Sequence, residues 1–118
     1  MRRIEYAFLV AAGLVFAAMP VHAQVPPDAP QLREQLQTLY MLEISQDLCK
    51  FEISDDQQDA IGRQTDDLEK KLDMSEEDSN RLYQQLENEM KSQKAGGLCN
   101  PKGAWAKTFK DELAKLGG

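Results

Sequence analysis

Apolar residues recur every three or four positions along most of the chain after residue 30, which is the spacing of one face of an α-helix. The first such stretch covers residues 31–51, and its apolar arc widens at Leu39–Leu42, as in a helix that more than one neighbour covers. Asp28 could cap this helix, and Pro30 would then fall in its first turn, where proline is tolerated. No stretch alternates apolar and polar residues for long enough to predict a strand. The pattern therefore predicts an all-α fold.

Two similar motifs, "ISDDQ" from Ile53 and "MSEED" from Met74, predict the starts of a second and a third helix. In each motif a serine follows an apolar residue, and an amide or acid three positions after the serine can complete a capping box. The acids after the serine also suit the positive end of a helix dipole. We expect helices over 55–73 and 76–94, with inward faces formed by Ala60, Ile61, Leu68 and Leu72, and by Leu82, Tyr83, Leu86 and Met90.

The glycines at "AGG" end the third helix, with Gly96 or Gly97 as its left-handed cap. Residues 102–116 then predict a short fourth helix with Trp105, Phe109, Leu113 and Leu116 along one stripe. The expected architecture is a small bundle of about four helices, forming a single helical domain over 31–118.

The start of the chain has a different pattern. Arg2 and Arg3 precede an apolar run over 7–19, and small residues follow up to Ala23. This is the layout of a secretory signal peptide, which we expect to be cleaved after Ala23, so that it covers 1–23. A membrane anchor is the alternative, but the run is shorter than the ~20 apolar residues that a spanning helix needs.

Residues 24–30 are rich in proline and predict an extended leader between the signal peptide and the helical domain. The expected location is outside the cytoplasm, in the periplasm or the extracellular space, with no membrane span in the mature chain.

The two cysteines, Cys49 and Cys99, fall at the end of the first helix and in the loop before the fourth. Export makes a disulfide between them the natural expectation. The bridge would pin that loop to the first helix, where Trp105 could cover it. A redox-active pair is the alternative, but it would normally use C-x-x-C spacing, which is absent.

The net charge and the single histidine make several classes of function improbable for this chain. The chain carries 14 basic and 20 acidic residues, a formal net charge of −6, and such a surface is a poor partner for nucleic acid. The only histidine, His22, lies within the predicted signal peptide. Hydrolases that activate a nucleophile with an imidazole, and zinc enzymes, are therefore disfavoured. We predict no cofactor, no metal site and no catalytic residue.

Acidic residues are numerous, but the spacing of a calcium-binding loop is absent. Several acids have a base four positions later, as Asp67 has Lys71 and Glu77 has Arg81, which is typical of a solvated helix surface. Glu43 differs because it stands inside the apolar arc of the first helix. It is the one candidate for a carboxylate-based attack on cell-wall sugar, which needs an acid with a raised pKa. The alternative places it at the edge of the core with its carboxylate in water.

Four aromatic residues are the candidate interaction surface: Tyr40, Tyr83, Trp105 and Phe109. The same helical spacing is typical of core packing, so both interpretations stay open.

Two features resemble known families. "ISDDQ" is similar to the L-T-x-x-Q motif of the periplasmic Spy/CpxP family, which implies a helical protein with a chaperone or stress-sensing role. Ile53, Ser54 and Gln57 match by type. A small exported helical chain with two cysteines about fifty apart and a following aromatic helix also resembles the HdeA acid chaperones. Here, however, a long helix precedes the first cysteine.

The sequence thus predicts a small, exported, non-catalytic helical protein that acts through contact with another envelope protein, as an adaptor, inhibitor or accessory module. A stress or acid chaperone with many clients is one alternative. A small carboxylate-based cell-wall glycosidase is the other.

Overall fold

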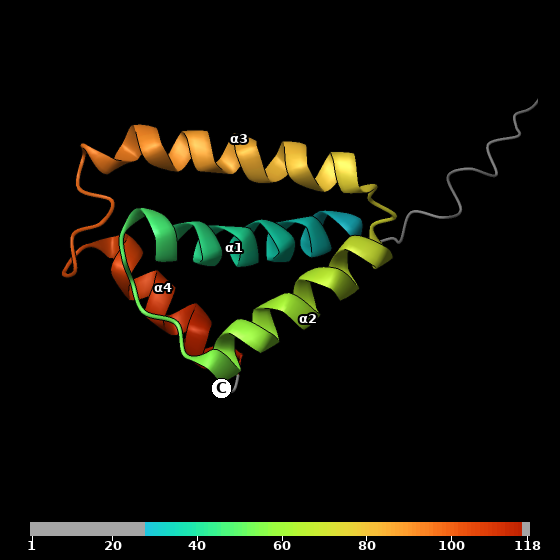
Figure 1. Ribbon diagram of the computed structural model, residues 1–118, viewed down its shortest axis with the longest axis horizontal. Helices are drawn as coiled ribbons and strands as arrows, with labels where there is room; N and C mark the ends of the chain where they lie inside the picture. Colours follow the sequence, from blue (N-terminus) through green and yellow to red (C-terminus); the bar gives the residue numbers. More distant parts are fainter. Residues whose placement is uncertain (1–27, 117–118) are drawn as a thin grey trace, which may run out of the picture.

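The computed structural model describes residues 28–116, so the predicted signal peptide (1–23) and most of the predicted leader (24–30) lie outside the described residues. The described part is helical and contains no strand, which confirms the all-α prediction (Figure 1). Its four helices are α1 (Ala29–Leu48), α2 (Asp55–Lys71), α3 (Glu76–Lys94) and α4 (Ala104–Lys115).

Helix α1 lies in the middle of the bundle. Helix α3 runs along one side of it in the same direction, and α2 and α4 lie on the other side (Figure 1). Because α1 has neighbours on several sides, its apolar residues are distributed around much of its circumference. The core therefore combines Leu36, Leu39, Tyr40, Leu42 and Ile44 of α1 with Ile61 and Leu68 of α2, Leu86 and Met90 of α3, and Phe109 and Leu113 of α4.

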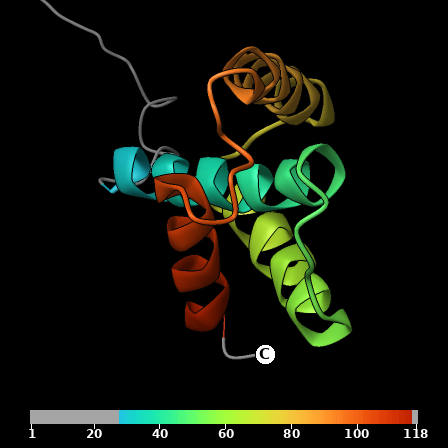
Figure 2. The same ribbon diagram turned by 90° about the vertical axis from the view of Figure 1, so that its left-hand side faces the viewer.

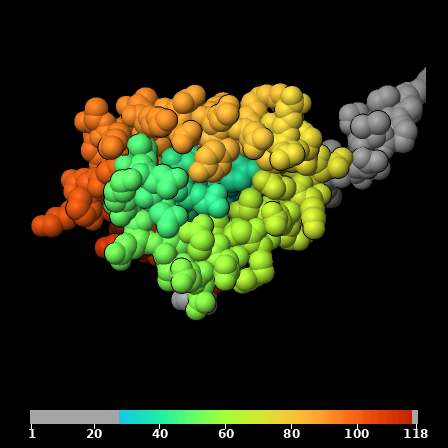
Figure 3. All heavy atoms as spheres, viewed as in Figure 1, coloured from blue at the N-terminus to red at the C-terminus, as the bar shows by residue number. Residues whose placement is uncertain are grey.

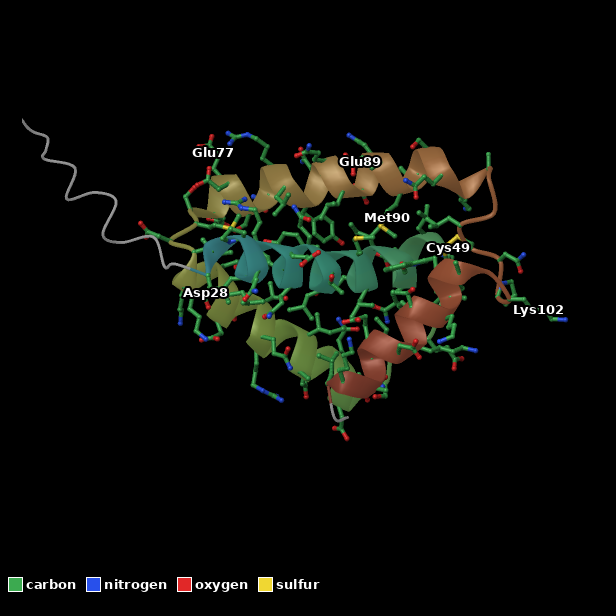
Figure 4. The ribbon with its side chains drawn as sticks, turned by 180° about the vertical axis from the view of Figure 1, so that it is seen from behind. Asp28, Cys49, Glu77, Glu89, Met90 and Lys102 are labelled. Atoms are coloured by element: carbon green, nitrogen blue, oxygen red, sulfur yellow. A yellow bond between two sulfur atoms is a disulfide. The ribbon has the colours of Figure 1, made fainter. Side chains whose placement is uncertain are left out.

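The space-filling view shows only a narrow band of α1 between α2 and α3 on the face of Figure 1 (Figure 3). Seen from behind, Met90 points from α3 towards α1, whereas Glu77 lies on the outer side of α3 (Figure 4). Burial agrees with this view, since Met90 is 2% exposed and Glu77 is exposed. The amphipathic pattern of α3 thus fixes which face meets the core.

Both predicted capping boxes are present. The Ser54 hydroxyl accepts a hydrogen bond from the backbone N–H of Gln57 at 3.1 Å, and the side-chain oxygen of Gln57 accepts one from the backbone N–H of Ser54 at 3.0 Å. Ser75 and Asp78 repeat this arrangement at 3.0 and 3.3 Å. A cap of this kind stabilises a helix by about 1 kcal/mol, and both helices begin at the predicted residue.

Helix α4 begins two residues later and ends one residue earlier than the predicted 102–116. Helices α1 and α2 end two or three residues earlier than predicted, and in each case a left-handed residue follows. Helix α1 ends at Leu48, three residues before the predicted end, and Lys50 has φ 63°. Helix α2 ends at Lys71 instead of 73, and Asp73 has φ 54°. A left-handed residue cannot continue a right-handed helix, and here it is not glycine, so the sequence carried no plain stop signal.

The first turn of α1 differs from the predicted cap. Asp28 occupies the N-cap position, but its side chain makes no capping hydrogen bond. The helix already begins at Ala29, inside the predicted leader, and Pro30 stands in its first turn. Proline needs no hydrogen-bond acceptor there, so it starts the helix without cost.

Two glycines have different roles. Gly97 has φ 99° and provides the left-handed residue after α3, as predicted for one of the two adjacent glycines. Gly62 lies exposed inside α2, and a Cβ added there would have no neighbour within 4 Å. It therefore does not serve a close helix crossing.

The predicted disulfide joins Cys49 to Cys99, whose Cα atoms are 5.0 Å apart. Figure 4 shows Cys49 at the end of α1, next to the connection between α3 and α4. The bridge fixes the start of α4 against α1. None of the helices described here is long and apolar enough to cross a membrane.

Candidate functional site

A partly buried hydrogen bond ties α4 to α1 near the disulfide. The indole N–H of Trp105 donates to the Ser45 hydroxyl at 2.7 Å, and that hydroxyl donates to the carbonyl of Met41 at 2.8 Å. Ser45 is fully buried, so each polar group of this chain of bonds would be costly to leave unpaired. Ser45 lies one helical turn before Cys49, and the bond and the bridge together hold the first turn of α4.

A second polar contact joins α1 to α2 at the edge of the core. The Tyr40 hydroxyl donates to the Glu69 carboxylate, and the Tyr40 ring meets Tyr83 of α3 edge to face at a centroid distance of 5.5 Å. Burial, followed by the hydrogen bond with Glu69, raises the pKa of Tyr40 to about 12. Tyr40 therefore stays protonated and connects three helices.

Carboxylates surround this tyrosine pair. Burial, followed by the negative charges of Glu69 and Asp47, raises the pKa of the half-buried Glu43. The pKa of Tyr83 is also raised, first by burial and then by the charges of Glu43, Asp47 and Glu87. The sequence left open whether Glu43 is an acid with a raised pKa or lies at the edge of the core with its carboxylate in water; its side chain is half-buried and its pKa is raised.

The four predicted aromatic residues do not form one continuous set of ring contacts. Tyr40 and Phe109 are buried in the core, and Tyr83 and Trp105 are half-buried. Tyr40 pairs with Tyr83, whereas Phe109 packs at 5.1 Å against Phe51, a residue that sequence reasoning did not single out. The four residues thus lie in two places: Tyr40 and Tyr83 meet between α1 and α3, and Trp105 and Phe109 belong to α4.

An open groove lies between α4 and the connection from α1 to α2. We call it the lysine groove, and its volume is about 540 Å³. Phe51 and Phe109 meet within it, and the lining is apolar apart from two lysines, Lys50 and Lys110, and one acid, Glu52. Its full lining is Lys50, Phe51, Glu52, Pro101, Ala106, Phe109, Lys110 and Leu113.

Figure 2 shows, from the end of the bundle, that α2 and α4 diverge below α1. A second groove is lined by residues of these three helices. This inter-helix groove has a volume of about 480 Å³. It is more polar, because Leu39, Leu42, Leu68 and Leu116 are accompanied by Glu34, Gln35, Thr38, Gln64, Glu112 and Lys115.

The exposed charges form local pairs along the helices. Lys71 contacts Asp67 at 3.0 Å, as the spacing predicted, whereas Arg81 contacts Asp78 at 3.4 Å and not Glu77. Within residues 28–116, no group of three or more acidic or cysteine side chains could hold a metal ion. Most acids of the described part are exposed, whereas Glu43, Glu69, Glu87 and Glu112 are half-buried.

Several residues of the site could not be recognised from the sequence. Ser45 reads as a polar interruption of an apolar helix, and Lys50 and Lys110 read as ordinary surface lysines. Phe51 carried a weak signal, since it is apolar and directly follows the cysteine segment. A comparison of the chain with protein-family models, curated proteins and solved structures finds no match.

Proposed function

We propose that this chain is a small exported protein that acts by binding another envelope protein, as an adaptor, inhibitor or accessory module. The observation that carries the proposal is the lysine groove, which is open, largely apolar and held by a disulfide-anchored helix. Its volume lies within the range of about 300–1,000 Å³ of binding sites. A preformed groove favours binding because less conformational freedom is lost on association.

The placement of Glu43 supports binding over glycoside hydrolysis. An acid catalyst must reach the sugar from the wall of a cleft, paired with a second carboxylate across the scissile bond. Glu43 lines neither the lysine groove nor the inter-helix groove. Its environment instead consists of the tyrosine pair and the neighbouring acids of α1 and α2.

The test is a capture experiment from envelope extract of the source cells. The full chain is expressed with a C-terminal tag, crosslinked in the extract and analysed by mass spectrometry. One stoichiometric partner supports a dedicated module, and a broad set of unfolded proteins would favour the chaperone alternative. If nothing is recovered above a tag-only control, while the purified protein cleaves cell-wall sugar and Glu43→Gln abolishes that cleavage, the binding proposal is wrong.

A further inference from the structure

The segment between α1 and α2 presents an unpaired backbone. Within the described residues, neither the amides nor the carbonyls of Phe51, Glu52 and Ile53 take part in a hydrogen bond, whereas the Cys49 and Ser54 amides on either side are bonded. Phe51 and Ile53 are half-buried, and Glu52 between them is exposed. Exposure thus alternates along these three residues, as it does in an extended segment with one covered side. An extended peptide can add to such a segment through its main chain.

The lysine groove lies directly beside this segment and offers a place for an apolar side chain. Phe51 belongs both to the segment and to the groove, and its ring meets Phe109 of α4 at 5.1 Å. Ala106 and Leu113 complete the apolar wall on α4. A partner segment that pairs with residues 51–53 can therefore place a neighbouring side chain against the exposed part of Phe51 in the groove.

The charges of the groove select the chemistry of that strand. Lys50 and Lys110 both line it, and among the ion pairs of the described part neither lysine takes part in one. Glu52 is the one acidic residue of the lining. On a chain with a net charge of −6, this groove is thus a locally positive apolar site. An apolar group next to a carboxylate complements it.

We propose that the lysine groove binds an extended segment of a partner protein in which an apolar or aromatic side chain adjoins a carboxylate, paired along the backbone of residues 51–53. The inference rests on the proposed function and specifies the kind of partner. Lys50 and Lys110 receive the carboxylate, while the half-buried Phe51, which packs on the buried Phe109, receives the apolar side chain.

A random heptapeptide library, selected against the purified full chain, tests this recognition. We expect the enriched peptides to share an apolar or aromatic residue next to aspartate or glutamate. Synthetic copies should shift the backbone amide resonances of residues 50–54 and 104–113. Their binding should weaken as salt rises, because the ion pairs of an open groove are screened.

Two variants and a matched control identify the lysines as the cause. Lys50→Asn removes a charge at φ 63°, a conformation that asparagine tolerates, and Lys110→Gln removes the second charge from an exposed helical position. Each variant should weaken the selected peptides about 5- to 10-fold, the effect of losing one charge-assisted contact. Lys94→Gln, at the exposed end of α3, should leave the affinity within twofold. Circular dichroism of all variants confirms that the helices are intact.

Three results would overturn the inference: no peptide enriched above the unselected library, a basic consensus, or binding that survives the double variant Lys50→Asn/Lys110→Gln. The capture experiment tests the proposed function independently of this groove. A native partner that crosslinks only to α3 or to the inter-helix groove would leave the proposed function intact and remove this groove as its site.

Discussion

Loss of the Cys49–Cys99 bridge should reduce stability by an amount that follows from the chain topology. The bridge closes a loop with a sequence separation of 50 residues. In the chain-entropy model, such a loop lowers the entropy of the unfolded chain by about 14 cal/mol/K, or about 4 kcal/mol at 25 °C. Small domains unfold with only about 5–15 kcal/mol, so this is a large share of the total.

The double variant Cys49→Ser/Cys99→Ser removes the bridge without leaving a free thiol. Urea denaturation followed by circular dichroism should show a free energy of unfolding about 4 kcal/mol lower than that of the oxidised protein. The melting temperature should fall by about 15–30 °C, as expected for a domain of this size. Both cysteines are half-buried, so the serine hydroxyls themselves cost little.

Reductant provides the internal control. It should bring the parent protein to the stability of the double variant and leave the double variant unchanged. A loss of less than about 1 kcal/mol in both comparisons would refute the entropic reasoning, because the unfolded chain would then be no freer without the bridge.

Three further changes probe separate parts of the fold. Trp105→Phe removes the donor to the buried Ser45 hydroxyl and should lower the free energy of unfolding by about 1–2 kcal/mol in urea denaturation. The same substitution made in a Ser45→Ala variant should cost less; an equal cost in both proteins would show that the hydrogen bond does not contribute to stability. Gly62→Ala lies in the exposed interior of α2 and should stabilise the protein by up to about 1 kcal/mol, whereas Gly97→Ala should destabilise it because Gly97 has φ 99°. If both variants raise the melting temperature, or both lower it, the backbone argument is wrong. The pKa of Glu43 is raised above 4.5, so its stabilising contribution is complete below that pH and is lost as pH rises through the folded-state pKa. Glu43→Gln should therefore reduce the loss of unfolding free energy that the parent protein shows as the pH rises above 4.5. If the pH dependence of stability is the same in both proteins, a group other than Glu43 causes it.

Local signals in the sequence were sufficient for much of the fold. Serine caps with a partner three residues later fix helix starts by contacts within one turn, so the starts of α2 and α3 followed from Ser54 and Ser75. The cysteine pairing followed because the chain has only two cysteines. The ends of α1 and α2 were harder to predict, because the left-handed residues after them are Lys50 and Asp73. A lysine or an aspartate in a sequence does not signal a left-handed conformation as a glycine does.

The candidate site could not be predicted because it depends on contacts between distant segments. Ser45 meets Trp105 across 60 positions of the chain, and Tyr40 meets Glu69 across 29. Periodicity says which residues share a face of one helix, but not which faces meet. The lysine groove has the same origin, since its two walls come from the connection after α1 and from α4.

Site-specific photocrosslinking in the source cells tests the central claim most directly. A photoreactive phenylalanine analogue replaces Pro101, an exposed residue that lines the lysine groove, and in a matched variant Gln84, an exposed residue of α3. If the chain acts by binding a partner in this groove, the first variant yields one dominant crosslinked protein and the second does not. Identical products from both positions, or none from the groove, would contradict the account.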